Sequence, residues 1–139
     1  MLSLKGDTIS PSAIPSIYID PAEEFLLKFF NKPQSQKGEQ IAKVLQDNPT
    51  WPVLYHLSPQ RELLLNWYPF NKKGSLLEIG AGCGALTGML ATKVGKVFAN
   101  ELTEQRSEII KRRFADKKNI TVLPGNQKDL QLNELVDYI

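Results

Sequence analysis

A glycine-rich turn between an apolar strand and an amphipathic helix constrains this chain more than any other feature of its sequence. Residues 76–87 read LLEIGAGCGALT. Glycine adopts backbone conformations closed to other residues and, having no Cβ, lets backbone amides approach a ligand closely. A purely structural tight turn is the alternative. Three glycines at alternating positions between a strand and a helix instead favour a loop that binds a nucleotide-type ligand.

From residue 75 onward the sequence alternates between short apolar runs and amphipathic segments. The apolar runs predict strands at residues 75–79, 96–100 and 119–123, and the start of a fourth at 136–139. The intervening segments predict helices over residues 85–94, after a cap at Thr103, and over residues 130–135. This order predicts an α/β fold: a Rossmann-like, doubly wound parallel sheet with right-handed crossovers and helices on both faces.

The first part of the chain lacks this alternation, and we therefore divide the sequence after residue 70. Residues 1–70 are predicted to form an arm and a helical extension, and residues 71–139 the sheet-forming half. The arm runs to residue 19, because its prolines block a helix.

Three helices are predicted in the extension. Asp20 caps the first, with Pro21 at its first position and Glu23 closing a capping box. The second covers residues 36–47. The third starts at Ser58 and Pro59, is terminated by Pro69, and is lined by Leu63, Leu64, Trp67 and Tyr68.

Composition narrows the possible classes of protein. The net charge of +2 is too small to indicate nucleic-acid binding by itself. The basic run at residues 111–113 lies between Glu108 and Asp116, which favours a solvated helix face over a phosphate-binding patch. Cys83 is the only cysteine, and neither a membrane-spanning apolar run nor a signal peptide is present in the sequence. These features predict a cytoplasmic protein without a membrane partner.

Glu78 decides between the ligands that a glycine-rich turn can bind. Gly80, Gly82 and Ala85 also satisfy the dinucleotide fingerprint, but Glu78 lies two residues before the first glycine, where its carboxylate would repel a pyrophosphate. S-adenosylmethionine has no phosphate and carries an α-ammonium and a sulfonium, so this carboxylate favours it. A salt bridge to a basic neighbour is the alternative role for Glu78.

Two further positions follow the next two strands. Glu101 lies twenty-one residues after Gly80, a spacing at which an acidic residue accepts the ribose hydroxyls. A charge at the start of the helix capped by Thr103 is the alternative. Asn126 follows the third strand, where its amide can contact an adenine edge or simply form a turn.

These residues resemble the class I S-adenosylmethionine-dependent methyltransferases. The family pattern of E/D-x-G-x-G-x-G, an acidic residue ending strand two and Gly-Asp after strand three appears here as residues 78–84, Glu101 and Gly125-Asn126. Asn126 departs from the usual Asp, so the adenine contact is the role that the resemblance implies least firmly. The resemblance covers roughly residues 55–139. It implies S-adenosylmethionine as the cofactor, bound by Glu78, Gly80, Ala81, Gly82, Cys83, Gly84, Glu101, Leu102, Asn126 and Gln127.

The segment at residues 51–70 is similar to bacterial methyltransferases encoded with or fused to glycosyltransferases. That similarity implies that Tyr55 and Arg61 contact the cofactor's carboxylate, although Tyr55 could merely pack and Arg61 be solvated. It implies an enzyme acting on a small-molecule or sugar acceptor. Ribosomal RNA adenine N6-dimethyltransferases are a second resemblance, and an inactive cofactor-binding fragment or interaction module is a third possibility.

The acceptor side of such enzymes follows strand four. A full class I core has seven strands, whereas this sequence accounts for about four and stops within the fourth. We therefore expect a C-terminally incomplete core, no assignable catalytic residue, and self-association through the exposed sheet edge at residues 136–139. His56, the only histidine, has no paired carboxylate in the sequence pattern and is predicted to be structural, as is Cys83. No metal-ligand spacing is present.

Overall fold

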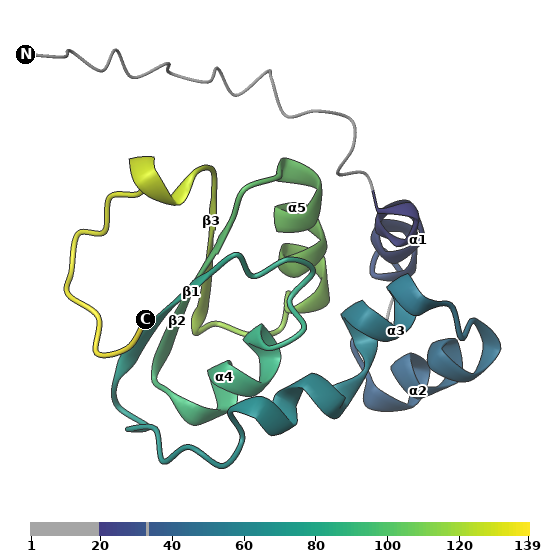
Figure 1. Cartoon of the computed structure of the whole chain (residues 1–139), viewed down its shortest axis with the longest axis horizontal. Helices are drawn as coiled ribbons and strands as arrows, with labels where there is room; N and C mark the ends of the chain where they lie inside the picture. Colours follow the sequence, from purple (N-terminus) through teal and green to yellow (C-terminus); the bar gives the residue numbers. More distant parts are fainter. Residues whose placement is uncertain (1–19, 33) are drawn as a thin grey trace, which may run out of the picture.

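The computed structural model describes residues 20–32 and 34–139 of the chain (Figure 1). Three parallel strands, β1 (Ser75–Ile79), β2 (Lys96–Glu101) and β3 (Ile120–Pro124), form one sheet in the order β1-β2-β3. All three lie where the apolar runs predicted them. The predicted arm of residues 1–19 falls outside the described residues.

The segment predicted to begin a fourth strand does lie beside β1. Tyr138 forms a parallel bridge with Leu76, and the Leu77 amide donates to the Tyr138 carbonyl at 3.0 Å. Tyr138 is thus on the side of β1 opposite β2, although the pairing is limited to this one bridge. Leu135 and Ile139 are exposed at this edge. Self-association through the edge stays a prediction.

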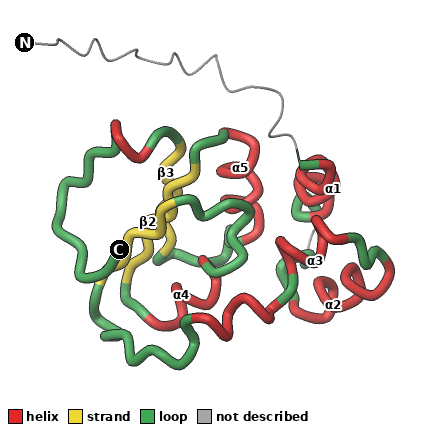
Figure 2. The backbone as a smooth tube through the Cα atoms, in the orientation of Figure 1, coloured by secondary structure: helices red, strands yellow, loops and turns green. Residues whose placement is uncertain are grey.

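The predicted helix at residues 130–135 is wrong. A short 3-10 helix, η4 (Gln127–Asp129), forms earlier, and the chain then returns to β1 as a loop, drawn in green in Figure 2. Leu135 is 98% exposed, and Leu130 and Leu132 are only half-buried, so the segment has no fully buried apolar face. Without a buried face, propensity alone does not hold so short a helix.

The two helices between the strands pack on the same face of the sheet. Leu76, Val97 and Ile120 are in register across the three strands and pack with α4 (Thr87–Lys93), while Ala99 and Val122 pack with α5 (Glu104–Arg113). The strand order β1-β2-β3 means that the connections through α4 and α5 both move across the sheet in the same direction. Two right-handed connections of this kind place both helices on the same face of the sheet. The expectation of helices on both faces is therefore wrong for the described part of the chain.

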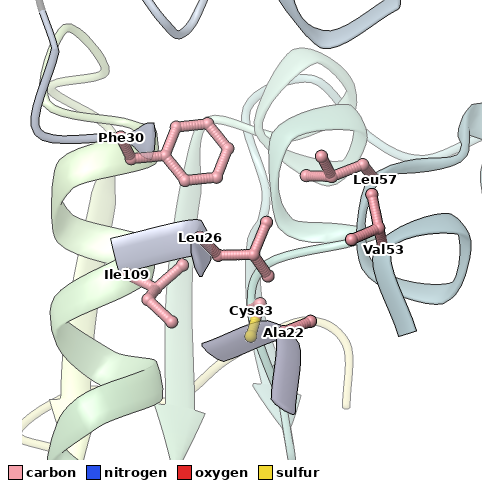
Figure 3. Packing of buried hydrophobic residues seen from close by; sticks show 7 residues of the cluster. All are labelled: Ala22, Leu26, Phe30, Val53, Leu57, Cys83 and Ile109. Carbon is pink, nitrogen blue, oxygen red and sulfur yellow. The ribbon is translucent and has the colours of Figure 1, made fainter. Parts of the chain in front are cut away.

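The N-terminal extension contains α1 (Pro21–Phe29), α2 (Gly38–Asp47), α3 (Trp51–Leu57) and the 3-10 helix η3 (Pro59–Leu64). In Figure 1, α1, α2 and α3 lie together on the far side of α5 from the sheet. One buried cluster joins them to the rest of the chain, as Figure 3 shows: Ala22, Leu26, Phe30, Val53, Leu57, Cys83 and Ile109. The extension thus shares a hydrophobic core with the sheet-forming half.

The start of α1 is only partly as predicted. Asp20 accepts from the Ala22 amide at 2.8 Å, which confirms it as the N-cap. Glu23 does not close a capping box. Its carboxylate instead accepts from Arg106 Nε on α5 at 2.6 Å, because a buried carboxylate gains more from a cation than from a backbone amide. This ion pair fixes α1 against α5.

The segment after α2 also departs from the predicted pattern. Trp51 and Pro52 begin α3, since proline in the first helical turn lacks only an N–H that the helix would not use. The predicted third helix is a 3-10 helix that ends at Leu64. Its supposed apolar face is exposed in Leu63 (70%), Leu64 (64%) and Trp67 (75%). Within the described residues, no helix has the length and apolar character needed to cross a membrane.

Candidate functional site

The glycine-rich turn leaves β1 with three residues in the left-handed region. Gly80, Gly82 and Gly84 have φ values of +70°, +60° and +78°. A Cβ built on Gly80 or Gly82 would meet nothing within 4 Å, whereas one on Gly84 would lie 2.7 Å from the Phe114 ring. The first two glycines therefore leave an open backbone surface, and the third serves close packing.

A cavity opens at the carboxyl ends of the three strands, beside this turn. Its lining includes every predicted cofactor-binding residue except Gly84. These are Tyr55, Arg61, Glu78, Gly80, Ala81, Gly82, Cys83, Glu101, Leu102, Asn126 and Gln127. Parallel strands place their carboxyl ends at one edge, which is why Glu78, Glu101 and Asn126, up to 48 residues apart in the chain, meet here.

Glu101 is the buried centre of the cavity wall. Its side chain is 4% exposed, and Oε2 accepts from the Gly82 amide at 2.8 Å. Oε1 accepts from the Thr103 amide at 3.0 Å. The carboxylate thus links the glycine-rich turn to the start of α5, and it has further lone pairs for a ligand's hydroxyl groups. The helix-start role and the ligand role are both compatible with this geometry.

Glu78 lies near the end of β1, where Oε2 accepts from Thr87 Oγ1 at 2.6 Å. It forms no ion pair with a described residue, so the alternative of a salt bridge finds no support. Burial raises the pKa of Glu78 from its usual 4.5 to about 7, and the Thr87 hydroxyl and the charges of Arg61 and Arg113 partly oppose this rise. The carboxyl therefore titrates near neutral pH.

The loop after β3 is held by a side chain that the sequence pattern did not single out. Asn100, 3% exposed, donates from Nδ2 to the carbonyls of Leu123 at 2.9 Å and Gly125 at 3.0 Å. Asn126 accepts from the Lys128 amide at 3.0 Å and so forms a turn, while also lining the cavity. The turn is present; contact of Asn126 with an adenine stays a prediction.

Tyr55 and Arg61, from the N-terminal extension, line the cavity. The Arg61 guanidinium lies 4.4 Å from the centre of the Tyr55 ring, a cation-π contact. Both residues line the cavity, and Tyr55 remains 44% exposed. The two residues predicted to act together are thus adjacent.

His56 has a carboxylate partner that the sequence did not reveal. Its Nε2 lies 2.8 Å from Asp20 Oδ2, and both residues line the cavity. The histidine is 3% exposed, so the pair joins α3 to the start of α1. Burial raises the pKa of Cys83 to about 12, which keeps this thiol protonated and unreactive, as predicted for a structural cysteine.

The basic run at residues 111–113 is not a uniform solvated face. Lys111 is exposed and Arg112 pairs with Glu108, but Arg113 is buried at 9% exposure. Arg113 Nη1 donates to the carbonyls of Cys83 at 2.9 Å and His56 at 3.0 Å. The prediction is therefore wrong for Arg113, because helix periodicity turns this residue toward the core.

No protein-family model matches the sequence. A probable ribosomal RNA small subunit methyltransferase A of Methanococcoides burtonii is 39% identical over 62 residues, which are 45% of this chain and 23% of that protein. A ribosomal RNA small subunit methyltransferase A of Geobacter sulfurreducens is 39% identical over 59 residues, 42% of this chain and 21% of that protein. The chain thus spans less than a quarter of the length of these curated relatives.

A solved structure shares the fold. The phosphoethanolamine N-methyltransferase 1 of Haemonchus contortus, in complex with phosphoethanolamine and S-adenosylhomocysteine, superimposes with a TM-score of 0.53 and 23% identity. The match covers 81% of this chain and 24% of that one. The chain has part of a Rossmann-like methyltransferase fold. Its three strands and the bridge at Tyr138 form that part, and the N-terminal helices precede it.

Proposed function

We propose that this chain is the S-adenosylmethionine-binding portion of a methyltransferase. The observation that carries the proposal is the meeting of two open glycines, Gly80 and Gly82, with two carboxylates, Glu78 and Glu101, in one cavity. The open glycine backbone admits a ligand that a Cβ would exclude, and the carboxylates suit hydroxyl groups and a cation rather than a phosphate.

Each residue has a role that follows from its chemistry. The cofactor supplies a methyl group on a positively charged sulfur, and the protein orients it and excludes water. Glu101 would accept from the ribose hydroxyls, Glu78 would face the α-ammonium, and Arg61 with Tyr55 would face the cofactor's carboxylate. Leu102, 50% exposed beside Glu101, and the loop with Asn126 and Gln127 would border the adenine.

We further propose a small-molecule or sugar acceptor. Five carboxylates line the cavity, Asp20, Glu78, Glu101, Glu104 and Asp129, against two guanidiniums, Arg61 and Arg106. Binding of a polynucleotide depends on cations that neutralise phosphates, and this rim has an excess of anions. The similarity of residues 51–70 to glycosyltransferase-associated methyltransferases supports the same acceptor class.

A ribosomal RNA adenine acceptor is the second candidate. It is favoured by the names of the curated relatives, whose match covers 45% of this chain for the Methanococcoides burtonii protein. In that case the cations that bind RNA would have to come from surfaces away from the cavity rim. A cofactor-binding module without methyl transfer is the remaining alternative.

Calorimetric titrations with three ligands test both the proposed cofactor and the proposed class of acceptor. S-adenosylhomocysteine is expected to bind at least about tenfold more tightly than NAD, a difference of about 1.4 kcal/mol. Tighter binding of NAD would reject the cofactor assignment. An RNA hairpin in a third titration is expected to bind weakly; tight binding that falls steeply with salt would replace the small acceptor by RNA.

Binding of S-adenosylhomocysteine is also expected to depend on pH through Glu78. Its pKa of about 7 means that the carboxyl is largely protonated at pH 6 and ionised at pH 8. Because the α-ammonium favours the ionised form, binding below pH 7 releases a proton, and affinity should rise up to about tenfold per pH unit and then level off. Calorimetry from pH 5.5 to 8.5 measures this, and Glu78→Gln should give a flat profile. An equally steep profile in Glu78→Gln would assign the proton to another group.

The same raised pKa has the opposite effect on the cofactor-free protein. A carboxyl whose pKa is higher in the folded state holds its proton more tightly there than in the unfolded chain. It therefore contributes stability at low pH, and this contribution is lost as the pH rises from about 4.5 to about 7. The carboxylate that favours the ligand thus disfavours the empty fold.

A further inference from the structure

Arg113 is a buried cation directly behind the glycine-rich turn. It is the last residue of α5, and its guanidinium carbon lies 5.5 Å from the centre of the Phe30 ring and 5.3 Å from that of Phe114. Nη1 donates both to the Cys83 carbonyl, inside the turn, and to the His56 carbonyl, at the end of α3. One side chain therefore holds together the turn, the N-terminal extension and α5.

Arg113 achieves this without a direct carboxylate partner. No described Asp or Glu lies within 4.0 Å of it, whereas its neighbour Arg112 forms an ion pair with Glu108 at 2.7 Å. Burial lowers the pKa of Arg113 to about 10, which still leaves it charged at neutral pH. A buried charge without an adjacent counter-ion is costly, and packing alone would be served better by an apolar side chain.

We propose that Arg113 is the positioning residue of the cofactor site: it fixes the glycine-rich turn through the Cys83 carbonyl and holds the turn against the N-terminal extension through the His56 carbonyl. The inference rests on the proposed function, because it assigns the turn to cofactor binding. The turn contains three glycines, which restrict the backbone less than other residues do. A fixed donor on the Cys83 carbonyl limits that freedom before the cofactor arrives.

The His56 carbonyl extends the same argument to the N-terminal extension. Arg113 ties the end of α3 to the turn, and the Asp20–His56 pair ties α3 to the start of α1. The extension carries Tyr55 and Arg61, which line the cavity. Arg113 thus links the glycine-rich turn to the part of the chain that carries these two residues.

Two variants test the proposal, each compared with Arg112→Met, which removes a neighbouring guanidinium that does not touch the turn. Arg113→Met removes both hydrogen bonds and the charge, and Arg113→Lys keeps the charge but loses the planar fork.

Amide hydrogen exchange and calorimetry complete the test. Exchange at residues 80–84 is expected to quicken about tenfold in both Arg113 variants relative to Arg112→Met. S-adenosylhomocysteine should bind at least about tenfold more weakly to Arg113→Met at pH 7. A folded Arg113→Met with unchanged exchange at the turn would overturn the proposal. If Arg113→Met does not fold, the exchange of Arg113→Lys at the turn decides in the same way. Failure of the unsubstituted protein to bind S-adenosylhomocysteine would reject the proposed function instead, and leave the exchange results to judge Arg113.

Discussion

Replacing Glu101 with alanine is expected to weaken S-adenosylhomocysteine binding by about 1.5–3 kcal/mol, or roughly 10- to 100-fold. The magnitude is that of hydrogen bonds to a charged group, because the carboxylate would accept the ribose hydroxyls. A second effect adds to this loss. The carboxylate already binds the amides of Gly82 and Thr103, and its removal frees the turn as well as the ligand.

Calorimetry at pH 7 measures the change, with Glu108→Ala as the matched control. Glu108 lies within α5, seven residues after Glu101, pairs with Arg112, and does not line the cavity. Glu101→Gln keeps one acceptor oxygen and should lose less affinity than Glu101→Ala. A folded Glu101→Ala with the dissociation constant of the unsubstituted protein would show that Glu101 is only a structural link between the turn and α5.

The strands of the second half could be predicted because each is a short apolar run bounded by turn residues. Predicted strand 75–79 is β1 to the residue, and the next two are each within one residue at either end. The prediction of the third helix of the extension was wrong because its apolar residues are not buried. Leu63, Leu64 and Trp67 have a spacing typical of a buried helix face, yet nothing in the described structure covers them. A sequence pattern records apolar side chains, not whether a surface is available to bury them.

The residues of the candidate site also divide into those whose positions could be predicted from the sequence and those whose positions could not. The glycines, Glu78 and Glu101 lie at strand ends, and the topology of a parallel sheet brings strand ends together, so their meeting could be predicted. The contacts of His56 with Asp20, 36 residues apart, and of Arg113 with Cys83, 30 residues apart, follow no spacing rule. They depend on how the extension packs against α5. The one available signal was helix periodicity, which puts Arg113 on the same face of α5 as Ile109 and Ile110.

The largest loss of stability is expected from Gly84→Ala. Its φ of +78° costs an L-residue about 1–2 kcal/mol, and the new Cβ would lie 2.7 Å from Phe114 Cε2, an overlap that costs about 1–3 kcal/mol more in a packed interior. We therefore expect a decrease of about 2–5 kcal/mol in the free energy of unfolding, measured by urea denaturation. Phe114→Leu should restore part of this loss in the double variant, because it relieves the overlap but leaves the backbone strain.

Gly82→Ala, at the same turn, is expected to reduce ligand binding much more than it reduces the stability of the fold. A Cβ there would meet nothing within 4 Å, so only the backbone strain of about 1–2 kcal/mol remains. The methyl group would instead project into the cavity, and S-adenosylhomocysteine binding should fall by more than tenfold in a protein that still folds. Gly38→Ala, at the start of α2 with nothing within 4 Å and an ordinary φ, is the control for both and should leave stability and binding unchanged within about 0.5 kcal/mol. Equal losses of stability in Gly82→Ala and Gly84→Ala would contradict the division of the turn into an open face toward the cavity and a packed face toward α5.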